Sequence, residues 1–117
     1  MIYHVMSSWS DARLNCQKIG KTGDLASVPD DATTLFIMEN FNFTQHAWIG
    51  GRRKSTDGVW EWSDGSEWFE EYENWDSGQP NDIGEVATYF FRRENDHWYD
   101  AVVTDEKWSF CQYSKSK

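Results

Sequence analysis

Tryptophan is the residue that most constrains how this chain can fold. The 117 residues include eight tryptophans, and aromatic residues make up 17% of the chain. Each buried ring covers about 150–250 Å², so most of these rings must share an aromatic core or line a binding surface. With 38% hydrophobic residues, the composition is that of a folded protein, and the length fits one domain spanning residues 1–117.

The charge of the chain is strongly negative and unevenly placed. The formal net charge is −9 at pH 7, which argues against non-specific binding of nucleic acid. No Lys or Arg occurs between Ser55 and Phe91. The carboxylates of this stretch are Asp57, Glu61, Asp64, Glu67, Glu70, Glu71, Glu73, Asp76, Asp82 and Glu85. The stretch is either a solvated acidic face or a surface that concentrates a cation.

The sequence gives no sign of a membrane span or a leader. The longest largely apolar run, 87–91, has five residues, whereas a spanning helix needs about 20. The first residues lack both a basic segment and an apolar segment, so no signal peptide is expected. This pattern is compatible with a mature or trimmed segment of a longer secreted precursor.

The two cysteines, Cys16 and Cys111, stand near opposite ends of the chain. One interpretation is a disulfide that joins the first and last elements and places the protein in an oxidising, extracellular setting. Closing so long a loop would stabilise the fold by about 4–5 kcal/mol in the chain-entropy model. The alternative is a pair of buried free thiols in a cytosolic protein.

The N-terminal part of the sequence predicts two helices. Ser8 and Asp11 form a capping pair for the first helix, which ends before Gly20. The second helix is predicted to be capped by Ser27 and to run to about Asn40. Its buried stripe is expected to consist of Ala32, Leu35 and Phe36.

Short strands are predicted before and after these helices. The segments are aromatic and β-branched, and Gly, Asp, Asn or Pro bounds them. The predicted strands are 3–5, 46–50, 59–62, 86–91, 97–100 and 108–112. Two helices combined with several strands indicate an α+β protein.

Six sequence motifs follow one another along the chain. They are W-x-x-A-x-x-x-C at 9–16, G-x-L-A-S at 23–27, W-I-G at 48–50, W-x-W-x-D-G at 60–65, N-W-x-x-G-Q-P-N at 74–81 and W-Y-D at 98–100. Together, at this spacing, they resemble the C-type lectin-like domain over nearly the whole chain. The resemblance implies an α+β fold with two helices, small antiparallel sheets and a long loop region. It also implies an extracellular or secreted binding domain, or the ectodomain of a membrane protein, with no enzymatic activity.

The resemblance implies that Cys16 and Cys111 form a disulfide. The family's second disulfide is missing, because its two positions are Ala87 and Val103 in this chain. Packing between apolar side chains is expected to replace that bridge. The long loop region should then depend more strongly on a bound ion for its order.

The family's principal calcium site also maps onto this sequence. The corresponding residues are Gln79, Asn81, Glu85, Tyr99 and Asp100. The resemblance implies that all except Tyr99 are Ca²⁺ ligands, because their side-chain oxygens suit a hard cation. Tyr99 stands where the family has Asn, and it could offer a stacking face to a sugar. The family's auxiliary calcium site is expected to be lost, because a position that normally carries Asp falls near Arg53.

The function implied by these residues is Ca²⁺-assisted binding of a glycan or glycoprotein at the loop of residues 79–85 and Asp100. Gln79-Pro80-Asn81 is a hybrid of two family motifs and therefore does not assign the sugar. The alternative is a calcium-independent module that binds a protein partner, which Tyr99 and the missing cysteine pair favour. An ice- or mineral-binding role has no specific support.

The remaining polar motifs are weaker. His4, His46 and His97 are scattered, so a structural or surface role is expected for each. No hydrolase elbow or phosphate-binding loop occurs, and no carboxylate pair stands out as a catalytic acid and base. Asn42 begins an Asn-Phe-Thr triplet and is a candidate N-glycosylation site.

Overall fold

The computed structural model of the protein describes residues 1–56, 58–92 and 95–113. Its two α-helices are α1 (Trp9–Gln17) and α2 (Asp31–Asn40), and a short 3₁₀ helix, η1, covers Glu70–Tyr72. The strands are β1 (Ile2–Ser7), β2 (Asp24–Leu25), β3 (Ala47–Arg53), β4 (Glu61–Trp62), β5 (Val86–Arg92), β6 (Asn95–Val102) and β7 (Lys107–Gln112). The α+β class is confirmed. Neither α-helix in the described residues is long and apolar enough to cross a bilayer.

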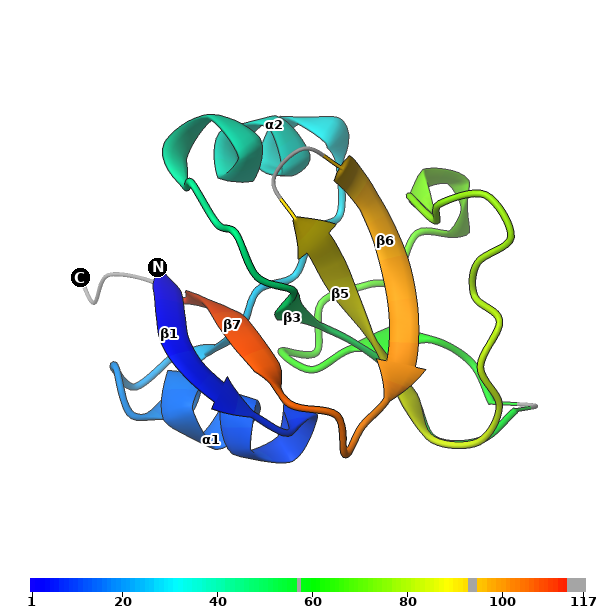
Figure 1. Ribbon diagram of the computed structural model, residues 1–117, viewed down its shortest axis with the longest axis horizontal. Helices are drawn as coiled ribbons and strands as arrows, with labels where there is room; N and C mark the ends of the chain where they lie inside the picture. The colour runs from blue at the N-terminus through cyan, green and yellow to red at the C-terminus, as the bar shows by residue number, and fades with distance from the viewer. Residues whose placement is uncertain (57, 93–94, 114–117) are drawn as a thin grey trace.

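The main sheet has the strand order β1-β7-β3-β5-β6, with β2 paired to β7 and β4 paired to β3. All strand pairs are antiparallel except β3 and β7, which are parallel. The sheet is therefore mixed, whereas the resemblance implied antiparallel sheets. Figure 1 shows β1 beside β7, with α1 and α2 at opposite ends of the molecule. The long loop between β4 and β5 lies on the side away from the N-terminus.

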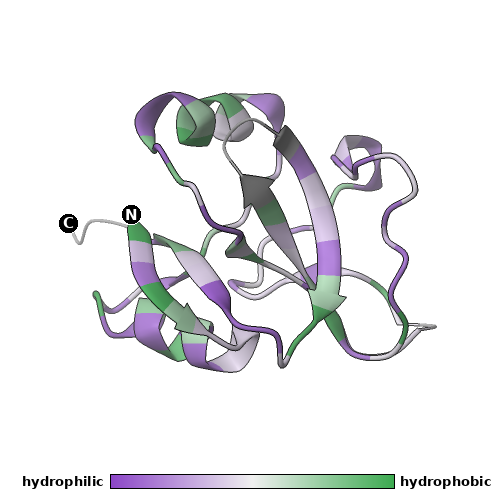
Figure 2. Ribbon diagram, in the orientation of Figure 1, coloured by the Kyte–Doolittle hydropathy of each residue, from purple (hydrophilic) through white to green (hydrophobic). Residues whose placement is uncertain are grey.

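The first helix forms as the sequence predicts. Ser8 is its N-cap, and its side chain accepts a hydrogen bond from the backbone N–H of Asp11. Trp9, Ala12 and Cys16 are buried on one face of the helix. Figure 2 shows hydrophilic and hydrophobic residues interspersed along both helices.

The second helix differs from the prediction in its cap and in its buried face. Asp30 is the N-cap, and its carboxylate accepts a hydrogen bond from the backbone N–H of Thr33. The buried residues are Thr34 and Ile37, whereas the predicted stripe of Ala32, Leu35 and Phe36 is solvent-exposed. The helix therefore turns a different face to the core from the one that the pattern indicated.

Two clusters of buried side chains make up the core. One centres on Ile49, Phe90, Trp98 and Phe110, and the other on Trp9, Trp48 and the disulfide. Trp48, Ile49 and Trp98, which belong to the W-I-G and W-Y-D motifs, are at most 1% exposed. Most of the tryptophans thus form the shared aromatic core that the composition required.

The predicted disulfide between Cys16 and Cys111 is present and joins α1 to β7. At the positions of the missing second bridge, Ala87 is fully buried and Val103 packs against the same cluster. Apolar packing therefore takes the place of that bridge, as expected.

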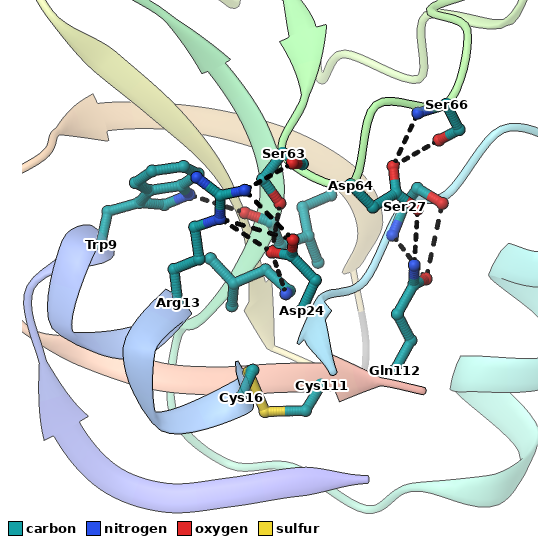
Figure 3. A network of polar contacts seen from close by, with 12 residues as sticks. Trp9, Arg13, Cys16, Asp24, Ser27, Ser63, Asp64, Ser66, Cys111 and Gln112 are labelled. Carbon is teal, nitrogen blue, oxygen red and sulfur yellow. Dashed lines mark hydrogen bonds and ion pairs between the residues drawn. A yellow bond between two sulfur atoms is a disulfide. The ribbon is translucent and has the colours of Figure 1, made fainter. Parts of the chain in front are cut away.

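A buried carboxylate ties α1 to the start of the long loop (Figure 3). Asp24 is 7% exposed, and it accepts hydrogen bonds from Arg13 Nε at 3.1 Å and Ser63 Oγ at 2.7 Å. Arg13 Nη2 also donates to the Ser63 carbonyl at 2.8 Å. The loop is thus anchored to the helix by one ion pair and its hydrogen bonds.

Replacing Asp24 with alanine is expected to lower the free energy of unfolding by about 1–3 kcal/mol, because Arg13 and Ser63 lose their shared acceptor. Urea denaturation followed by circular dichroism measures the loss. Asp24→Asn is the control: it keeps an acceptor oxygen but removes the charge, and it should lose less. An unchanged Asp24→Ala midpoint would contradict the role assigned to this carboxylate.

Candidate functional site

The loop of residues 79–85 folds back onto β6 through Asp100. The Asp100 side chain is almost completely buried, and its two oxygens accept backbone N–H groups of Asn81 and Asp82, each at 3.0 Å. The Asp100 backbone N–H donates to Gln79 Oε1 at 3.4 Å, and the Gln79–Pro80 peptide is cis. Three of the five predicted site residues, Gln79, Asn81 and Asp100, are therefore brought together.

Tyr99 faces the other side of β6, because successive side chains of a strand alternate between its two faces. Its hydroxyl donates to Asp76 Oδ2 at 2.6 Å, and its ring stacks on Tyr89 with centroids 5.7 Å apart. The side chain is half-buried in this arrangement. Tyr99 is therefore engaged with Asp76 and Tyr89, away from the groups gathered around Asp100.

Glu85, the fifth predicted residue, lies just before β5 and is solvent-exposed. Within the part of the chain that the structure describes, its side chain makes no hydrogen bond or ion pair with the other four. Its carboxylate can therefore turn toward or away from Asp100 at little cost in free energy.

A cation of the protein itself stands next to the loop. Arg53 Nη2 donates to the Asp82 carbonyl at 3.0 Å, and the guanidinium lies 5.0 Å from the centre of the Trp60 ring. The loss of the family's auxiliary calcium site near Arg53 stays a prediction. The Gly84 N–H also donates to Thr56 Oγ1 at 2.8 Å. Hydrogen bonds from the protein thus hold the loop, and its dependence on a bound ion stays a prediction.

The loop carries an excess of negative charge. Burial, and then repulsion from Asp100 and Asp105, raise the pKa of Asp82, while Lys107 acts in the opposite direction. Because the native state raises this pKa above its ordinary value, ionising Asp82 lowers the stability of the fold, and this cost fades as the pH falls through the raised value. A bound cation would relieve the same repulsion.

The donor chemistry of this loop suits a hard cation, although it is poor in carboxylates. The groups gathered at this point are the Asp100 carboxylate, the Gln79 side-chain amide and the backbone of Asn81 and Asp82. Carboxylate and amide oxygens are ligands that Ca²⁺ prefers. The described residues contain no group of three or more His, Cys, Asp or Glu side chains that could hold a metal ion. The residues thus fit Ca²⁺ by atom type, and the small number of charges predicts weak binding.

Nothing in the sequence indicated the contacts made by Lys107, or the hydrogen bond that Asp76 accepts from Tyr99. The Lys107 side chain is 6% exposed, and its ammonium lies 4.0 Å from the centre of the Tyr89 ring and 5.1 Å from that of Trp48. Burial lowers the pKa of Lys107. These contacts join β7, β5 and β3, and no local motif in the sequence signals them.

The three histidines make structural contacts. His4 packs edge-on against Trp108, His46 stacks on Tyr89, and His97 Nδ1 lies 3.0 Å from Asn74 Oδ1. Asn42 is solvent-exposed in the connection between α2 and β3, and its glycosylation stays a prediction.

Comparisons with known proteins agree on one family. Residues 5–113 match the family model of the lectin C-type domain. Among curated relatives, ladderlectin of Oncorhynchus mykiss is 34% identical over 106 residues, which cover 86% of this chain and 54% of ladderlectin. The chain therefore spans about half the length of this relative.

Solved structures show the same fold. The carbohydrate-recognition domain of cow CD23, determined in the presence of a GlcNAc2Man3 oligosaccharide, gives a TM-score of 0.79 at 25% identity, covering 98% of this chain and 87% of that one. A calcium-independent type II antifreeze protein gives 0.78 at 24% identity, covering 97% and 85%, and shows the fold alone.

Proposed function

Because this chain belongs to the C-type lectin domain family, a family of binding domains and not of enzymes, we propose that it binds carbohydrate with the assistance of Ca²⁺. The proposed site is the loop of residues 79–85 together with Asp100. The observation that carries the proposal is the convergence of Gln79, Asn81 and Asp100 at one point of β6. The glycan of a glycoprotein in an extracellular setting is the proposed partner.

In this proposal Gln79, Asn81, Glu85 and Asp100 would hold the ion. The ion supplies coordination positions for two neighbouring sugar hydroxyls. The Gln79 and Asn81 amides each offer a donor and an acceptor, so they can hydrogen-bond to those hydroxyls. Asp100 holds the loop backbone in place through the N–H groups of Asn81 and Asp82. Stacking of a sugar on Tyr99 stays a prediction.

Calcium at millimolar concentration is expected to raise the melting temperature, because the ion binds the native state in preference to the unfolded chain. Glu85→Gln should abolish most of this rise, because Glu85 is one of only two carboxylates in the proposed ligand set. Its exposed side chain makes no structural contact within the described residues, so the melting temperature without calcium should not change. Scanning calorimetry with and without EGTA measures both quantities.

The matched control is Glu71→Gln, which removes an exposed carboxylate of η1 from the same acidic stretch. This variant should keep the full calcium response. If both variants lost the calcium-dependent rise in melting temperature equally, calcium would be held by the general negative charge of the surface and not by a specific site. A Glu85→Gln protein with an undiminished response would remove Glu85 from the proposed ligand set.

A second candidate function is calcium-independent binding of a protein partner. It is favoured by the engagement of Tyr99 with Asp76, at a position where the family has a ligand. The fold itself also occurs in an antifreeze protein described as calcium-independent. EGTA distinguishes the two candidate functions. It should abolish calcium-assisted binding of a glycan, and it should leave calcium-independent binding of a protein partner unchanged.

A further inference from the structure

A cleft between α1 and β3 is lined by two arginines and by no carboxylate. It has a volume of about 260 Å³, and its lining consists of Trp9, Ser10, Arg13, Leu14, Gln17 and Arg52. The helical residues from Ser10 to Gln17 in this lining recur at the spacing of one helix face, so they form a stripe along α1. Arg53, the next residue of β3, points to the other face and contacts the loop of residues 79–85. The cleft is therefore separate from the proposed calcium site.

Arg52 brings a guanidinium without an ion-pair partner to this cleft. Its guanidinium carbon lies 4.9 Å from the centre of the Trp9 ring, which belongs to the buried core and so fixes the position of the arginine. Within the described residues the Arg52 side chain makes no ion pair, and its buried Nε has no acceptor. Glu61, the residue opposite it on β4, is solvent-exposed and does not pair with it. The terminal nitrogens of Arg52 are therefore available to a ligand.

Arg13 brings a second guanidinium, most of whose donors are already used. Its Nε donates to Asp24 Oδ1 at 3.1 Å, and its Nη2 donates to Asp24 Oδ2 at 3.3 Å and to the Ser63 carbonyl at 2.8 Å (Figure 3). The other terminal nitrogen, Nη1, donates to no acceptor in the part of the chain that the structure describes. Asp24 thus balances the charge of Arg13 and holds this side chain in place, while the charge of Arg52 stays without a partner.

We propose that this cleft binds the oxyanion group of a small acidic organic molecule, independently of calcium. A guanidinium presents its N–H donors in a planar fork that matches two oxygens of a carboxylate, sulfate or phosphate group. Two guanidiniums that line one cleft repel each other, and an anion between them relieves that repulsion. The Ser10 hydroxyl and the Gln17 amide add further donors, and the exposed Leu14 side chain offers an apolar contact to the carbon atoms of the ligand.

The size of the cleft indicates how large this ligand can be. About 260 Å³ is slightly below the range of about 300–1,000 Å³ that is typical of small-molecule sites. The cleft therefore suits a charged group and the few carbon atoms that carry it. Because the anion is held at the protein surface, its binding should weaken as salt is added.

The experiment is a calorimetric titration of the whole protein with glucuronate, glucose 6-sulfate and glucose 6-phosphate, in EGTA and at low ionic strength. These three acids share one sugar ring and differ in the charged group, so their relative affinities identify the oxyanion. Neutral glucose is the reference, and we expect it to bind at least about tenfold more weakly than the best of the acids. EGTA removes the calcium on which the proposed glycan site depends, so this result is independent of that proposal.

Arg52→Gln should weaken binding of the best acid by about tenfold, because it removes the guanidinium that has no ion-pair partner. Arg52→Lys keeps the charge without the fork, and it should weaken binding by only about two- to fivefold. Glu61→Gln should strengthen binding, because it removes the negative charge opposite Arg52. Lys18→Gln is the matched control, since Lys18 is an exposed cation next to α1 that does not line the cleft, and this variant should bind as the natural protein does.

Thermal melts of the four variants check that they are folded, and Arg52→Lys keeps the test valid if Arg52→Gln is not. Absence of binding of all three acids at tens of millimolar would overturn the proposal, and so would equal binding of neutral glucose. An equal loss in Lys18→Gln and in the Arg52 variants would also overturn it, because the anion would then be held by scattered surface cations and not by the cleft.

Discussion

Replacing Trp48 with alanine is expected to lower the free energy of unfolding by about 3–5 kcal/mol. The side chain is fully buried in β3, so its removal leaves a cavity the size of an indole ring. The same change removes the hydrogen bond from Trp48 Nε1 to the Ser7 carbonyl at 3.0 Å and leaves that buried oxygen without its partner. Denaturant unfolding measures the loss as a shift in midpoint at constant slope.

Trp60→Ala is the comparison for this prediction. Trp60 is half-buried and lies at the surface beside Arg53, so its removal should cost clearly less than that of Trp48. A loss below about 1 kcal/mol for Trp48→Ala would show that Trp48 does not occupy the central position described for it.

Removing the disulfide by the double substitution Cys16→Ala and Cys111→Ala is expected to cost about 4–5 kcal/mol. The bridge spans a sequence separation of 95 residues, so its loss gives the unfolded chain a large increase in conformational freedom. Denaturant unfolding with and without a reductant measures the effect. Reductant should lower the stability of the natural protein to about that of the double variant.

The double variant also serves as the control, because a reductant should not change its free energy of unfolding. Two thiols that can be alkylated in the native, non-reduced protein would contradict the disulfide. A double variant as stable as the natural protein would show that the bridge contributes nothing to the free energy of unfolding.

The two helices show what local sequence can and cannot predict. The first was correctly predicted because its cap, Ser8, and its buried residues act within the helix itself. The second was predicted with the wrong cap because Ser27 is engaged elsewhere: its backbone N–H donates to Gln112 Oε1 at 2.9 Å. The chain at 24–25 pairs with β7 and continues toward Pro29, so the helix begins only after Asp30.

The candidate site divides in the same way. The resemblance to the C-type lectin-like domain implied that Gln79, Asn81 and Asp100 belong to one site, and hydrogen bonds do bring these three residues together. The hydrogen bond from Tyr99 to Asp76 and the packing of the Lys107 ammonium on the Tyr89 ring were not predictable from the sequence. They depend on how strands distant in sequence lie against each other, which no local pattern specifies.

The measurement that tests calcium-assisted binding most directly is the calcium-dependent change in melting temperature of three proteins: the natural chain, Tyr99→Asn and Asp100→Ala. Tyr99→Asn places an amide where the family has a ligand, and Tyr99→Phe controls for the lost bond to Asp76. The account predicts a small rise for the natural chain and none for Asp100→Ala. Because residue 99 faces the other side of β6, it predicts a rise for Tyr99→Asn that is no larger than that of the natural chain. Absence of any calcium-dependent shift in both the natural chain and Tyr99→Asn at millimolar calcium would contradict it.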